Sequence, residues 1–140
     1  MTRTRQAGGI PLEQRAESVP AQRAAEMDPA ALGHRIVEIA SDKKASDIVL
    51  LRTAELTTMA DYFVICSGRS DRQIGALAGA IVDVLRDEGV KPLGIEGKAS
   101  GRWVLIDYGA VIVHVFAADE REYYALERLW SAAQQVVRVV

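Results

Sequence analysis

Residues 101–116, GRWVLIDYGAVIVHVF, read as two β-strands joined by a two-residue turn at either Tyr108–Gly109 or Gly109–Ala110. Apolar side chains alternate along both halves, as they do in strands whose successive residues point to opposite faces of a sheet. Either turn keeps the same residues together on each face. One face is wholly aliphatic and is expected to pack against helices; it consists of Val104, Ile106, Val111, Val113 and Val115.

The opposite face of this hairpin has a different composition. It carries Trp103, Leu105, Asp107, Ile112 and His114, and is called the mixed face below. In one interpretation the mixed face belongs to the core, and its histidine is hydrogen-bonded and inert. In the other it is a docking platform, because a tryptophan flanked by aliphatic residues and a charge is typical of interface hot spots. Composition alone leaves both interpretations open.

Caps and apolar spacing predict the remaining elements. Asp28 followed by Pro29 marks a helix start, and Ser70 with Gln73 has the spacing of a capping box. Helices are predicted from 28 to about 43, from 70 to 88 and from 119 onward, with strands over 47–52, 61–67 and 91–97 besides the hairpin. This order predicts a single domain of the α/β (α+β) class, with a five-stranded mixed sheet and helices mainly on one face.

The length of 140 residues favours one domain. Residues 1–27 contain Gly8–Gly9, Pro11 and Pro20 and no sustained apolar periodicity, so they are predicted to be a disordered tail. The folded domain is expected over 28–131, and 132–140 are expected to form a C-terminal tail.

Charge and hydropathy exclude several classes of protein. The net charge is −2, and the 17 basic and 19 acidic residues are interspersed, which disfavours nucleic acid as the principal partner. No run approaches the roughly 18 apolar residues of a membrane span, and the N-terminus lacks the apolar block of a signal peptide. The protein is therefore expected in the cytoplasm, without membrane contact. The lone cysteine, Cys66, is predicted to be a small core residue.

Candidate catalytic chemistry is sparse. His34 and His114 lie in different predicted elements, and no cysteine or paired carboxylate completes a metal site, so neither a metal nor a cofactor is expected. The turn over 67–71 precedes a helix, where a phosphate can bind, but it lacks the glycines and lysine of a P-loop. A triad of Ser67, His114 and an aspartate lacks the G-x-S-x-G turn. We expect no catalytic residues; a nucleotide-handling enzyme that uses the 67–71 turn is the alternative.

Three segments carry a resemblance to a known family: DYFVICSGRSDRQ, KPLGIEG and GRWVLIDYGAVIVHVFAADEREYYALERLW. Together they resemble the ribosomal silencing factors, or Iojap-like proteins, from about Ala30 to Trp130. The resemblance implies a non-enzymatic repressor of translation that binds the intersubunit face of the large ribosomal subunit, through its fourteenth protein. Such a repressor blocks joining of the small subunit during starvation or stationary phase. The resemblance also implies a nucleotidyltransferase-like topology and a frequent homodimer.

The ribosome-contacting tryptophan and aspartate of that family map onto Trp103 and Asp107. With Leu105, Ile112 and His114 they form the expected ribosome-binding set, in which apolar residues are central and the carboxylate lies at the edge. The chain departs from the family pattern at Ala110, where an aspartate is frequent, and at Arg69, where a threonine is frequent. The first departure weakens the expected attraction for a basic ribosomal protein. A homodimeric interaction module, with the mixed face turned on itself, is a further alternative.

Overall fold

The computed structural model describes residues 27–124 and 131–140, so nearly all of the predicted N-terminal tail lies outside the described residues. Asp28 caps the first described helix by accepting a hydrogen bond from the Ala31 N–H, with Pro29 in its first turn. In chain order the elements are α3 (Pro29–Asp42), β1 (Ser46–Arg52), β2 (Tyr62–Gly68), α4 (Asp71–Asp87), β3 (Gly94–Lys98), the 3-10 turn η1 (Ala99–Gly101), β4 (Trp103–Asp107), β5 (Val111–Ala117), α5 (Ala118–Tyr124) and β6 (Gln134–Val139).

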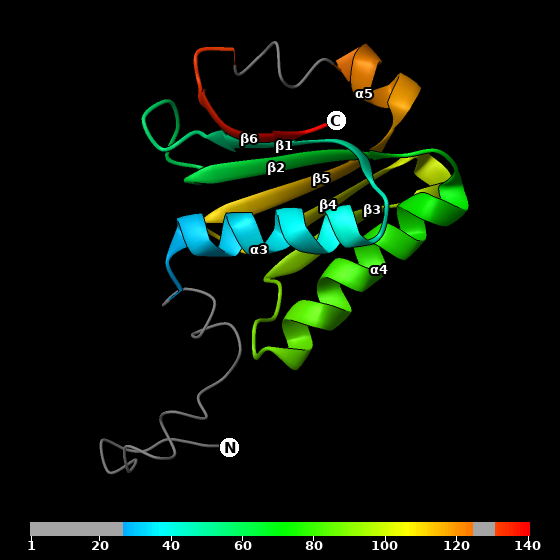
Figure 1. Cartoon of the computed structure of the whole chain (residues 1–140), viewed down its shortest axis with the longest axis horizontal. Helices are drawn as coiled ribbons and strands as arrows, with labels where there is room; N and C mark the ends of the chain where they lie inside the picture. Colours follow the sequence, from blue (N-terminus) through cyan, green and yellow to red (C-terminus); the bar gives the residue numbers. More distant parts are fainter. Residues whose placement is uncertain (1–26, 125–130) are drawn as a thin grey trace.

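The strands form one mixed sheet in the order β3-β4-β5-β2-β1-β6. β2 and β5 run parallel, and the other neighbouring pairs are antiparallel. Figure 1 shows α3 and α4 on one side of the sheet and α5 on the other. This arrangement confirms the predicted α+β class and mixed sheet. Within the described residues, no helix is both long and apolar enough to cross a membrane.

The predicted number of strands is wrong: the sheet has six strands, not five. The sixth, β6, lies within the segment expected to be a C-terminal tail and pairs antiparallel with β1. Its sequence, QQVVRV, gave no clean alternation, because β6 is an edge strand that is exposed over most of its length. Val137 and Val139 nevertheless pack against the main core. The folded unit therefore extends to the last residues of the chain.

The main core lies between the sheet and the helices α3 and α4. All five aliphatic residues of the hairpin belong to it and are at most 5% exposed, as predicted. Cys66 is also buried in this cluster, and burial raises the pKa of its thiol to about 12. A thiol with this pKa is protonated at neutral pH, so Cys66 acts as a small apolar residue, as the sequence predicted.

The other face of the sheet carries a second, smaller apolar cluster. Its buried members come from β1, β2 and β5 and from Ala60 before β2, and three partly buried residues lie at its margin. Trp103 and Leu105 of the mixed face are two of these marginal residues, and Ala133 is the third. The buried members are Val49, Leu51, Ala60, Phe63, Ile65, Ile112 and Phe116.

Candidate interaction site on the mixed face

The hairpin turn sets which residues share the mixed face. Gly109 and Ala110 form the turn, with the Tyr108 N–H donating to the Val111 carbonyl at 2.9 Å. Gly109 has a φ of +86°, a left-handed conformation that favours glycine. The register then pairs Asp107 with Ile112, Leu105 with His114, and Trp103 with Phe116. All five predicted residues therefore lie on one face, as the alternation required.

Exposure divides these five residues into two groups. Ile112 and His114 are only 6% and 5% exposed, so the structure places them beneath the surface rather than on it. Trp103, Leu105 and Asp107 are half-buried and reach the surface. The core interpretation therefore holds for Ile112 and His114, whereas Trp103, Leu105 and Asp107 are the accessible part of the mixed face.

The indole of Trp103 is held by two aromatic neighbours from β5. It stacks on Phe116, with ring centroids 4.9 Å apart and planes 24° from parallel. Its Nε1–H donates to Nδ1 of His114 at 3.2 Å. A stacked ring with its polar edge bonded has little rotamer freedom left to lose when a partner binds, which favours tight binding.

His114 is a neutral acceptor in this arrangement. Burial lowers the pKa of its imidazole to about 4, so the ring is uncharged at neutral pH. Since Nδ1 accepts the hydrogen bond from the Trp103 indole N–H, the imidazole's own proton lies on Nε2. Phe63 packs against the same imidazole with ring centroids 5.2 Å apart. The histidine is thus a hydrogen-bonded core residue, and it orients the tryptophan.

The buried histidine predicts a loss of stability in mild acid. Between pH 6.5 and 4 the unfolded chain takes up a proton on His114 while the folded chain does not. The free energy of unfolding therefore falls as the pH drops through this window, by up to roughly 3 kcal/mol from this group. Urea denaturation of wild type and His114→Asn at pH 7 and pH 4.5 measures this fall in the free energy of unfolding. The fall should be smaller in the variant. His34→Asn, which removes the exposed histidine, is the control and should show the same fall as wild type. Equal losses in wild type and His114→Asn would contradict the assignment.

Two carboxylates border the accessible part of the mixed face. Asp107 accepts the Gly109 N–H through Oδ1 at 2.7 Å, which ties it to the hairpin turn. Glu96 of β3 lies opposite Leu105, and with Gly97, Trp103 and Leu105 it lines a cavity of about 200 Å³. Glu96 could not be assigned to this face from the sequence, because β3 is short and only its pairing with β4 places Glu96 here. Phe116 was also missed, although alternation from His114 places it here.

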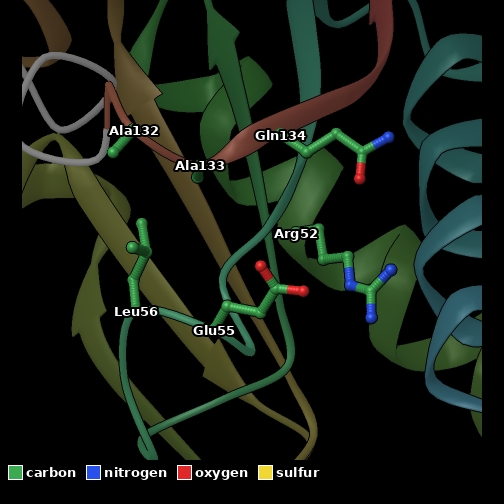
Figure 2. Close-up of a pocket in the computed structure, with 6 residues that line it drawn as sticks. All are labelled: Arg52, Glu55, Leu56, Ala132, Ala133 and Gln134. Atoms are coloured by element: carbon green, nitrogen blue, oxygen red, sulfur yellow. The ribbon is translucent and has the colours of Figure 1, made fainter.

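A smaller cavity of about 130 Å³ lies between the β1–β2 loop and the start of β6. Figure 2 shows Glu55 between Leu56 on one side and Arg52 on the other, with Gln134, Ala133 and Ala132 across the opening. A cavity of this size is well below the roughly 300–1,000 Å³ of small-molecule sites. None of its lining residues is aromatic. The cavity beside Trp103 is therefore the stronger candidate for an interface.

Two side chains at the turn considered for phosphate binding form a helix cap. Ser70 accepts the Gln73 N–H at 3.1 Å, and the Gln73 side chain accepts the Arg69 N–H at 2.6 Å. Ser67 is 3% exposed, and its Oγ accepts from Arg121 at 2.9 Å. Across the described part of the chain, no group of three or more histidine, cysteine or acidic residues is placed to hold a metal ion. The Ser67 hydroxyl is therefore buried and bonded, whereas the Ser70 and Gln73 side chains cap α4.

Comparisons with known proteins assign the chain to a family. Residues 26–139 match the family model described as ribosomal silencing factor during starvation. The ribosomal silencing factor of Bacillus subtilis is 48% identical over 92 residues, which cover 66% of this chain and 78% of the relative. That of Halalkalibacterium halodurans is 44% identical over 100 residues, covering 71% and 86%. A crystal structure of a protein from Chromobacterium violaceum gives a TM-score of 0.72 at 37% identity, covering 81% of this chain and 94% of that one. The chain belongs to the ribosomal silencing factor family, a family of ribosome-associated regulators of translation.

Proposed function

We propose that the chain binds the large ribosomal subunit at its intersubunit face, through Trp103, Leu105 and Asp107, and thereby blocks joining of the small subunit. The observation that carries this proposal is the half-exposed Trp103, held in one orientation by Phe116 and His114. An oriented tryptophan beside an aliphatic residue and a carboxylate has the composition of an interface hot spot. Ile112 and His114 support this surface from beneath.

The partner on the subunit is proposed to be its fourteenth ribosomal protein. The chain has a net charge of −2, and two carboxylates border the accessible part of the mixed face. Ribosomal proteins are generally basic, so the charges are complementary and steer the two surfaces together. Repression is steric and needs no catalytic group and no cofactor, and it operates in the cytoplasm during starvation or stationary phase.

Pelleting with isolated ribosomal subunits tests this proposal. The purified chain is mixed with large subunits, small subunits or joined ribosomes from Bacillus subtilis and spun through a sucrose cushion. We expect it to pellet with large subunits and hardly with the other two, because joining covers the binding surface. Prior addition of the chain should also reduce subunit joining in a sucrose gradient. Absence of pelleting with large subunits, or equal pelleting with joined ribosomes, would refute the proposal.

A further inference from the structure

The cavity beside Trp103 lies at the free edge of the sheet. β3 is the last strand on that side, and its five residues are all exposed. Glu96 and Gly97 of β3, with Trp103 and Leu105 of β4, line the cavity of about 200 Å³. A partner that covers Trp103 therefore also reaches Glu96.

Gly97 shapes the floor of this cavity. Its φ is +83°, and a Cβ added there would collide with the carbonyl oxygen of Trp103. The position therefore requires glycine, and residue 97 contributes only backbone atoms to the lining of the cavity.

The lining combines apolar walls with one carboxylate. Trp103 and Leu105 supply the walls, and Glu96 supplies the charge. Among the described residues, Glu96 has no basic group within ion-pair distance, although Lys98 follows two positions later on the same face of β3. The volume is below the roughly 300–1,000 Å³ typical of sites for small molecules, and it suits a single side chain.

We propose that this cavity receives an arginine side chain from the protein partner. The aliphatic stem would lie along Leu105 and the part of the indole that lines the cavity, and the guanidinium N–H groups would donate to the Glu96 carboxylate. A guanidinium is suited to the latter contact, because it is planar, weakly hydrated and able to form two parallel hydrogen bonds with a carboxylate. The identity of the partner as a ribosomal protein rests on the proposed function, whereas the specificity of the cavity does not.

A titration of the full chain with acetyl-arginine amide tests the cavity directly by NMR. We expect saturable shifts of the Gly97 amide and the Trp103 indole N–H. The neutral analogue acetyl-citrulline amide should bind about tenfold more weakly, because its uncharged N–H groups form weaker hydrogen bonds with the carboxylate than a guanidinium does. Glu96→Gln should weaken arginine binding by a similar factor, whereas Asp87→Asn, at an exposed carboxylate on α4, should leave it unchanged. Equal binding of the two amides, or no effect of Glu96→Gln, would overturn the proposal.

A second experiment measures how variants of the chain pellet with large subunits. Glu96→Lys should reduce binding about tenfold or more, because it places a like charge against the incoming arginine. Asp87→Lys makes the same change in net charge on the other side of the sheet and should change binding less than about twofold. If wild type pellets and the two variants do so equally, the cavity proposal fails while the function stands. If wild type does not pellet but arginine binding depends on Glu96, the function fails and the cavity stands.

Discussion

Replacing Trp103 with alanine is expected to lower the affinity of the chain for large ribosomal subunits about 30-fold or more, the equivalent of about 2 kcal/mol for a central aromatic residue. The substitution removes the half-exposed ring that stacks on Phe116 and leaves the Nδ1 of His114 without its donor. The fold should persist, because Trp103 lies at the margin of the smaller apolar cluster and not in the main core. Far-UV circular dichroism checks the fold, and pelleting measures the affinity.

Met59→Ala is the matched control for this variant. Met59 is 62% exposed in the β1–β2 loop. This loop is bonded to the hairpin turn through Asp61 and Ala110, so it lies at the opposite end of β4 from Trp103. Its truncation also removes exposed apolar surface, but binding should be unchanged. A folded Trp103→Ala chain that binds as tightly as wild type would refute the site. Sedimentation velocity of both variants shows whether the same face also holds a second copy.

Much of the fold could be predicted from the hairpin, because its signal is local and repeated. Alternation over 103–107 and 111–116 assigns both faces without knowledge of the neighbouring strands, and the register confirms it. The helix starts at Asp28 and Ser70 could also be predicted, since each depends on one side chain that accepts a hydrogen bond from a nearby N–H group. These features are set by residues within a few positions of one another.

The exposure of the mixed face could not be predicted, because it depends on distant residues. Phe63 packs on His114 through the parallel pairing of β2 with β5, and the sequence contains no local sign of that pairing. The contribution of Glu96 depends on the pairing of β3 with β4, which places it opposite Leu105 and which only the structure reveals. β6 was missed because the residues of an exposed edge strand need not alternate between apolar and polar side chains.

Arg121 is a further residue whose role only the structure reveals, and its replacement should have the largest effect on stability. It is 5% exposed and lies in the middle of the short helix α5. Its Nη1 donates to the Asp47 carbonyl and to Ser67 Oγ, and its Nη2 lies 3.7 Å from the Asp47 carboxylate. Arg121→Met should lower the free energy of unfolding by about 3 kcal/mol, because it leaves the half-buried Asp47 carbonyl and the buried Ser67 hydroxyl without this donor. Urea denaturation followed by circular dichroism measures the loss.

Arg138 provides the control, because it pairs with the same Asp47 carboxylate at 2.8 Å but from an exposed position. Arg138→Met should cost less than about 1 kcal/mol, since exposed ion pairs contribute little. If Arg121→Met is too unstable to measure, Arg121→Lys keeps the charge, loses the two-pronged geometry and should give an intermediate loss. Equal losses for Arg121→Met and Arg138→Met would show that burial does not set the strength of this contact. A larger loss of unfolding free energy for Arg121→Met would show that one buried guanidinium stabilises the packing of α5 against β1 and β2, on the side of the sheet that carries Trp103.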